Sequence, residues 1–345
     1  MELQARRIFR FALVTALSAT IGFAMQLNFT VLPPVLAILL SLEPAPPPGF
    51  KAMLALVTVV VLTTGIGLLL VPMLLNYPLT ALLLVGLGLY TSSWLMVHLN
   101  QQAVGVFLAM GFVLISAVAL ANEQVALLTI ASLAGGMVIV ILVQWLVYPF
   151  FPEDPSPAGG GPPADAPPDA QESGWIALRS TLIVLPVYIA ALSNPSLWMA
   201  ALIKALTLGQ QRSFGNARQA GIELLGSTFL GGCFAVLFWA LLSILPHLWT
   251  LFLLALALGI YGASKLFGLL GSRYTSSLWL DTLMTLWIML APAVADSANG
   301  KDVYKAFFVR FFLFVWVTLY AWVAMVLLEA MRHRARKSAT AAIPD

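Results

Sequence analysis

Apolar stretches about as long as a bilayer is thick recur along almost the whole chain. A transmembrane helix needs about 20 mainly apolar residues, and shorter helices are tolerated where other helices surround them. Of the 345 residues, 61% are hydrophobic and 9% are charged, whereas about 25% of the residues of a soluble domain are charged. The chain is therefore expected to be an all-α integral membrane protein. Its predicted membrane helices, about twelve, lie at residues 9–26, 29–42, 52–72, 78–97, 103–121, 125–149, 176–193, 196–209, 219–244, 248–266, 275–294 and 303–329.

A segment rich in proline, glycine and acidic residues divides these helices into two sets of six. Residues 152–174 have too few apolar side chains to bury a core, so they are expected to form a flexible cytoplasmic linker. Residues 82–90 and 253–261, in corresponding places of the two halves, are similar in sequence. Because each half has an even number of helices, the two repeats are expected to run parallel, related by an axis along the membrane normal. The predicted domains are residues 1–151, the linker, residues 175–331 and a basic cytoplasmic tail at 332–345.

Lysine and arginine residues gather in alternate loops. With the N-terminus inside, the cytoplasmic stretches hold most of them, including Arg6, Arg7, Arg10, Lys51 and Arg179, and the outside holds mainly Lys301 and Lys305. Cytoplasmic loops of membrane proteins carry an excess of these residues. We therefore expect an N-in, C-in, multi-pass protein of the bacterial inner membrane.

Two of the predicted helices, the second and the eighth, are short and begin at breaks near residues 28 and 194. Asn28 and Asn194 each stand just before a stretch that contains proline. Short, broken helices at matching places in two halves indicate a transport site. Phe29 and Trp198, beside the breaks, could stack on a flat substrate, although tryptophan more often marks the membrane interface.

Motifs around these breaks recur in a known family. They are Pro-Ser-Leu-Trp at 195–198, Arg-Gln-Ala-Gly-Ile-Glu-Leu-Leu-Gly-Ser-Thr at 218–228 and the glycines at 231–232, with a weaker echo in Leu32-Pro33-Pro34, Lys51 and residues 63–67. These motifs resemble the fusaric acid resistance and aromatic acid exporter family, and the resemblance covers both halves. In place of the sizeable cytoplasmic domains of the larger members, this sequence has only the linker and a short basic tail.

The resemblance implies efflux of small aromatic or carboxylated compounds beside a periplasmic adaptor protein of the membrane-fusion type. The aluminium-activated malate transporters of plants are distantly similar, so the resemblance also leaves an anion channel as an alternative. A non-transporting membrane scaffold is a third hypothesis. It predicts a sealed bundle with no polar cavity.

Three ionisable residues, Lys204, Glu223 and Asp281, lie inside predicted helices, where charges are costly and usually functional. At 1.5 Å per residue each lies about 6–9 Å inside the cytoplasmic boundary, so the three are expected in one layer that could couple transport to protons. Asp281 is the leading candidate because no basic residue lies within one turn of it. Alternatively, Lys204 snorkels to the interface and Glu223 pairs with Arg218. The corresponding positions of the first half are apolar.

Other charged residues lie near the two membrane surfaces. Arg212 and Arg218, after the eighth helix, either attract anions at the cytoplasmic mouth or simply set the topology. Arg310, inside the last helix, either snorkels outward or lines an anion path. A polar outer loop, where an adaptor would dock, is expected from Asp296, Lys301, Asp302 and Lys305.

Several classes of function lack their motifs in this sequence. No Walker-type phosphate loop and no hydrolase signature occurs, and residues 43–51 do not carry the loop signature of the major facilitator superfamily. With one cysteine and three histidines, neither a metal site nor a cofactor is expected. The scattered basic residues argue against a nucleic-acid partner. The sequence therefore favours a non-enzymatic, proton-driven exporter and leaves a homo-oligomer open.

Overall fold

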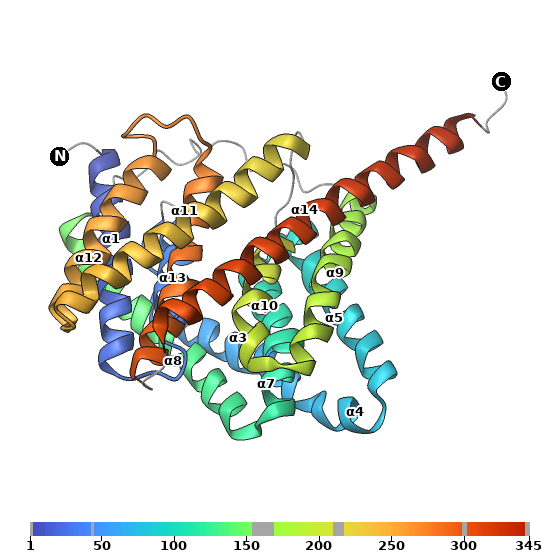
Figure 1. Ribbon diagram of the computed structural model, residues 1–345, viewed down its shortest axis with the longest axis horizontal. Helices are drawn as coiled ribbons and strands as arrows, with labels where there is room; N and C mark the ends of the chain where they lie inside the picture. The colour runs from blue at the N-terminus through green and yellow to red at the C-terminus, as the bar shows by residue number, and fades with distance from the viewer. Residues whose placement is uncertain (1–2, 43–44, 154–168, 210–216, 299–301, 342–345) are drawn as a thin grey trace.

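The computed structural model describes residues 3–42, 45–153, 169–209, 217–298 and 302–341, in which every regular element is a helix (Figure 1). Among these residues, ten helices are long and apolar enough to cross a membrane, and α2 and α10 are shorter apolar helices. The chain is an all-α, multi-pass membrane protein, as predicted. The elements are α1 (Leu3–Ala24), α2 (Leu32–Ser41), α3 (Phe50–Leu69), α4 (Val71–Asn76), α5 (Pro78–His98), α6 (Gln102–Met110), η1 (Gly111–Ile115), α7 (Ser116–Ala121), α8 (Glu123–Val147), η2 (Tyr148–Phe150), α9 (Ala170–Ser193), α10 (Pro195–Gly209), α11 (Ala217–Ile244), α12 (Leu248–Leu266), α13 (Ser276–Ala298) and α14 (Val303–Ala341).

Each predicted segment contains a helix, and the second and eighth are short as expected. The third segment is split into α3 and α4, with Pro72 near the start of α4. The last helix, α14, continues to Ala341 through the described part of the basic tail and extends past the rest of the bundle in Figure 1.

The fifth segment of each half departs from regular α geometry. In the first half it is α6, the π-helical turn η1 and α7, and π turns often occur at functional sites. In the second half it is α13, which contains Pro292. Since proline has no N–H group, the carbonyl of Ile288 loses its usual helical donor.

Helices pack in corresponding pairs in the two halves. The first segment of each half packs on the second and the sixth: α1 on α2 and α8, and α9 on α10 and α14. The third segment packs on the fifth and the sixth, as α3 does on η1 and α8 and as α11 does on α13 and α14. A duplicated six-helix unit would produce this correspondence.

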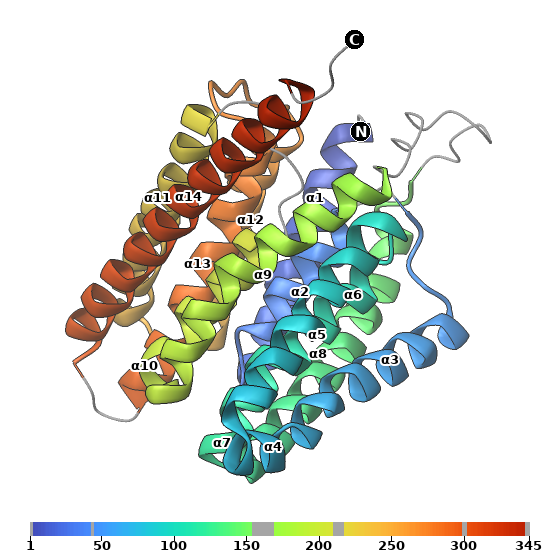
Figure 2. The same cartoon turned by 90° about the vertical axis from the view of Figure 1, so that its right-hand side faces the viewer.

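Two further helix pairs, α1 with α12 and α5 with α9, join one half to the other. Figure 2 shows α11 to α14 on one side, α3, α5, α6 and α8 on the other, and α1 and α9 between them. The α1–α12 contact is close and apolar, because a Cβ added to Gly259 would lie 3.2 Å from the Cα of Ala12. The α5–α9 contact is polar, with a hydrogen bond of 3.1 Å from Ser93 Oγ to Ser180 Oγ.

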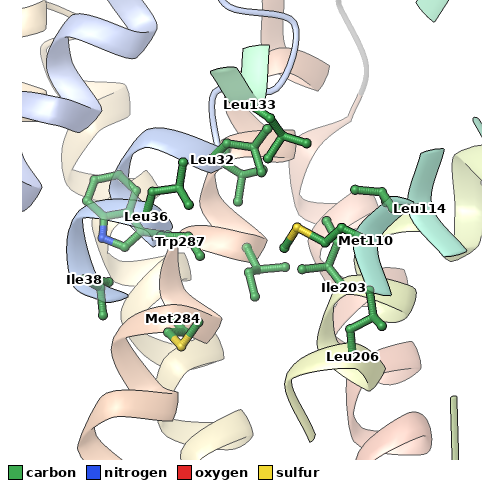
Figure 3. Close-up of a cluster of buried hydrophobic side chains, with 14 of the residues drawn as sticks. Leu32, Leu36, Ile38, Met110, Leu114, Leu133, Ile203, Leu206, Met284 and Trp287 are labelled. Carbon is green, nitrogen blue, oxygen red and sulfur yellow. The ribbon is translucent and has the colours of Figure 1, made fainter. Parts of the chain in front are cut away.

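The main hydrophobic cluster draws side chains from both halves. Within this cluster each short helix contacts the other half of the protein. Helix α2 contacts α13, and α10 contacts η1 and α7. The two halves predicted as domains therefore share a core, and α2 and α10 are short where protein, rather than lipid, surrounds them. Figure 3 labels ten of the residues involved, Leu32, Leu36, Ile38, Met110, Leu114, Leu133, Ile203, Leu206, Met284 and Trp287.

Helix α1 begins and α14 ends at the same end of the bundle, the terminal end (Figures 1 and 2). The opposite end, the asparagine end, holds Asn28, Asn122 and Asn194, which lie between consecutive helices. The sequence predicts that the terminal end faces the cytoplasm and the asparagine end the periplasm.

Candidate functional site

A cavity of about 380 Å³, the central cavity, lies between the two halves at the asparagine end. The first half contributes the α1–α2 connection and the ends of α7 and α8, and the second half contributes α10, α13 and α14. Most lining side chains are apolar, such as Val118, Met199 and Ile288. Ligand pockets have volumes of about 300–1,000 Å³. The central cavity therefore has room for a small molecule.

Two of the asparagines at this end, Asn194 and Asn122, cap the helices that follow them. Asn194 Oδ1 accepts a hydrogen bond of 3.3 Å from the amide of Leu197, in the first turn of α10. Asn122 Oδ1 accepts a bond of 2.9 Å from the amide of Gln124 in α8. Such side chains satisfy amides at a helix start that have no partner within the helix. Asn194 thus fixes the start of α10 at the cavity, whereas α2 starts after Val31 without a side-chain cap.

The two aromatic residues predicted to contact substrate differ in position. Phe29 lines the central cavity. Trp198 is partly buried against the main hydrophobic cluster and, among the described residues, is not part of the cavity wall. Only Phe29 is placed to stack on a molecule in this cavity.

An ion pair between Asp296 and Arg310 forms part of the cavity wall. Arg310 Nη2 donates to Asp296 Oδ2. The Arg310 side chain is 18% exposed and the Asp296 side chain is 10% exposed. The expectation that Asp296 belongs to an outer loop is wrong. Helix α13 continues to Ala298, so Asp296 lies in its last turn and turns toward α14. Arg310, expected either to snorkel outward or to line an anion path, lies on a cavity wall.

A second cavity of about 310 Å³, the outer chamber, lies against the same ion pair. Asp296 and Arg310 line both cavities, while Asp302 and Lys305 line the outer chamber only. The amide of Lys305 donates to Asp302 Oδ1 at 3.2 Å, which fixes the start of α14. The fourth residue of the predicted outer loop, Lys301, lies outside the described residues.

Lys204 and Asp281, predicted to share a layer, meet in the interior. Lys204 is 1% exposed, and its Nζ donates to Thr285 Oγ1 at 2.8 Å. The Thr285 hydroxyl in turn donates to the backbone oxygen of Asp281 at 2.6 Å. The Asp281 carboxylate, in a residue 9% exposed, acts electrostatically on the ammonium group. Lys204 therefore does not snorkel to the interface.

Thr285 is a member of this cluster that the sequence patterns did not identify. Its position four residues after Asp281, on the same helix face, was the available signal. The spacing continues along α13 through Ile288 and Pro292 to Asp296. This stripe runs from Asp281 in the buried cluster to Asp296 on the wall of the central cavity, over about 22 Å at 1.5 Å per residue.

The other predicted cytoplasmic groups are less defined. Glu223 is half-buried in α11, and its place in the charged layer stays a prediction. Arg212 and the side chain of Arg218 lie outside the described part of the chain. Among the described residues, no group of three or more histidine, cysteine, aspartate and glutamate residues is placed to hold a metal ion.

Arginine–glutamate ion pairs lie at the terminal end in both halves. In the first half, Arg7 and Arg10 of α1 both pair with Glu153. Arg10 Nη2 of α1 lies 2.6 Å from Glu153 Oε2, just after η2. Arg179 Nη1 of α9 lies 3.0 Å from Glu329 Oε1 of α14. Sequence patterns predicted only that Arg10 and Arg179 orient the chain. Both are buried. Arg179 ties the first segment of its half to the last, and Arg10 ties α1 to the residues that follow η2.

Residues 7–147 match the family described as "Protein of unknown function (DUF2955)". No curated protein and no solved structure matches the chain. The matched region runs from α1 to the last residue of α8, which is the first six-segment half. Lys204, Asp281 and Arg310 lie outside it.

Proposed function

We propose that this protein is the inner-membrane subunit of an efflux system that exports small aromatic or carboxylated anions. The observation that carries this proposal is the pairing of the central cavity with a buried charged cluster on the same two helices. Met199 and Ile203 of α10 and Ile288 of α13 line the cavity. Lys204 follows Ile203 directly, and Thr285 lies one turn before Ile288. Both belong to the charged cluster.

The cavity wall suits an amphipathic anion. Its apolar residues, including Phe29, would contact the flat body of the molecule, and Arg310 would contact the anionic group. A guanidinium group binds carboxylates through two parallel hydrogen bonds. The Asp281–Lys204 interaction would supply the coupling to protons. Protonation of Asp281 removes its attraction for the ammonium group and so changes the contact between α10 and α13.

Export from cells tests the proton-coupling role. Asp281→Asn keeps the size of the side chain and removes its charge, and it is expected to abolish export of aromatic acids driven by a pH gradient. Glu172→Gln, which changes an exposed acidic residue in the first turn of α9, is the matched control and should export normally. Normal export by Asp281→Asn at equal protein levels would contradict the coupling role.

A periplasmic adaptor of the membrane-fusion type is the partner that we propose, docking at the asparagine end. Asp302 and Lys305, on the outer chamber at the start of α14, are the charged residues to test there. Reversal of both charges should reduce copurification with a coexpressed adaptor. Unchanged copurification would place the docking surface elsewhere.

Two alternative functions make different predictions. An anion channel would pass current in planar bilayers without a pH gradient, whereas an exporter of the proposed type would not. A non-transporting scaffold predicts a bundle without a polar cavity, and the cavity wall that carries Asp296 and Arg310 favours transport over that alternative.

A further inference from the structure

The Asp296–Arg310 ion pair occupies a position that a bound anion would also favour. Both residues line the central cavity and the outer chamber, so the pair stands between two spaces large enough for small molecules. Among the described residues, Asp296 and Arg310 are the ionisable residues of the central cavity wall. An anion in that cavity has Arg310 as its cationic partner, and Arg310 is already paired with Asp296.

The guanidinium group of Arg310 is not fully used by this pair. Nη2 donates to Asp296, while Nη1 is buried and meets no hydrogen-bond acceptor in the described part of the chain. A buried donor without an acceptor costs about 1–3 kcal/mol. An oxyanion with two oxygens could bond to both nitrogens of the fork.

We propose that Asp296 is an intramolecular competitor for the anion site of Arg310. On this view the Asp296 carboxylate holds the guanidinium until the anionic group of a bound molecule takes its place. The inference rests on the proposed function and adds a specificity determinant to it. A neutral molecule of the same shape gains nothing from the exchange, so the pair selects anions.

The neighbouring charges are compatible with this exchange. Asp302 and Lys305 line the outer chamber beside the pair and have opposite charges, so together they add little net field. The apolar wall of the central cavity weakens screening by water, which strengthens the attraction between Arg310 and an anion. Selectivity should therefore depend mainly on Arg310 and on the competitor that it releases.

Binding of two matched probes to the full chain in lipid nanodiscs tests the proposal. The probes are 2-naphthoate and its neutral analogue 2-naphthamide, measured by calorimetry. Asp296→Asn should bind 2-naphthoate at least about tenfold more tightly than the wild type, and Arg310→Gln at least about tenfold more weakly. Affinity for 2-naphthamide should change less than about threefold. Equal or weaker binding of 2-naphthoate by Asp296→Asn, or parallel changes for both probes, would overturn the proposal.

A second variant serves as a control for loss of stability, because Asp296→Asn leaves the partly buried Arg310 without its counter-ion. The double variant Asp296→Asn/Arg310→Gln removes both charges and is expected to fold. It should bind the two probes with equal affinity, and a retained preference for 2-naphthoate overturns the proposal. If export in cells is normal while these binding differences are absent, the competitor role fails and the proposed function stands. If the wild type exports no aromatic acid, the proposed function itself fails.

Discussion

Lys204 is a cation that the protein keeps entirely away from solvent, and its neighbours explain how. A buried ammonium group is tolerated only where hydrogen bonds and opposite charge compensate for lost hydration. Thr285 provides an acceptor at 2.8 Å, and the Asp281 carboxylate provides the opposite charge. Because Thr285 donates its own proton to the Asp281 backbone, its hydroxyl oxygen is oriented to accept from Lys204.

Thr285→Val should therefore destabilise the protein although it preserves the shape of the side chain. Loss of a hydrogen bond to a charged group is worth about 1.5–3 kcal/mol in free energy of unfolding. Thr282→Val is the matched control, since the Thr282 hydroxyl donates within its own helix to the oxygen of Leu278. Unfolding in mixed micelles should separate the two variants by at least about 1 kcal/mol. Equal stabilities would show that the bond to Lys204 contributes nothing.

The arginine–glutamate contacts of the two halves should differ in strength, because the carboxylates differ in burial. The side chains of Arg10 and Glu153 are 9% and 11% exposed, whereas Glu329, the partner of Arg179, is 36% exposed. Glu153→Gln leaves a buried arginine with a neutral partner and should cost about 3–5 kcal/mol. Glu329→Gln also leaves a buried arginine, but water already screens the more exposed Glu329 carboxylate, so its loss should cost less than that of Glu153. Thermal unfolding of both variants in one detergent checks the order, and a larger loss for Glu329→Gln would contradict it.

At the scale of the element, helix irregularities are matched by specific partners. Pro186 lies inside α9 and cannot bond to the carbonyl of Leu182. The hydroxyl of Tyr320, on α14, donates to that carbonyl at 3.2 Å. A group freed by proline in one helix is thus satisfied by a side chain from another, as membrane helices require.

This compensation predicts a non-additive pair of substitutions. Tyr320→Phe alone should lower the free energy of unfolding by about 0.6–1 kcal/mol. In the Pro186→Ala background, the new amide at residue 186 can bond to Leu182, so Tyr320→Phe should cost close to nothing. A double-mutant cycle of unfolding free energies measures the difference. The same cost in both backgrounds would exclude the compensation.

At the scale of the whole molecule, the number and approximate positions of the helical segments could be predicted from sequence, but their partners could not. Length and apolarity identify a spanning helix, and the asparagine breaks identified α2 and α10. In a soluble helix the apolar stripe also marks the buried face. Here the lipid-facing side is apolar too, as the 77% exposure of Leu83 in α5 shows. Hydrophobic periodicity therefore gave no information about which face contacts protein.

The same limit applies to the candidate site. Lys204 and Asp281 could be identified because each is an unusual residue in an apolar stretch. Their link through Thr285 depends on a contact between residues 81 apart, and threonine is common in membrane helices. Asp296 was misplaced because a carboxylate near a helix end resembles a loop residue until its partner on the next helix is known. Arg10 and Arg179 followed the positive-inside pattern, which concealed their buried pairs.

The contacts between halves indicate that the linker is not needed to hold them together. α1 of the first half packs on α12, and α9 of the second half packs on α5. Hydrogen bonds between halves add to this, such as the 2.9 Å contact between the hydroxyls of Ser116 and Tyr188. The free energy of association of the halves therefore comes from these two interfaces, whereas cutting the chain between the halves changes the chain entropy only modestly.

Cleavage in the linker should consequently leave the protein intact. With a protease site inserted between residues 154 and 168 and an affinity tag on the C-terminal half, both fragments should copurify in mild detergent after complete cleavage. The melting temperature should stay within a few degrees of that of the uncut protein. Each half expressed alone should aggregate or be degraded, because α1 loses α12 and α9 loses α5. A first half that is monodisperse and folded by itself would show that the shared core is not required for folding, and the halves would then be independent domains.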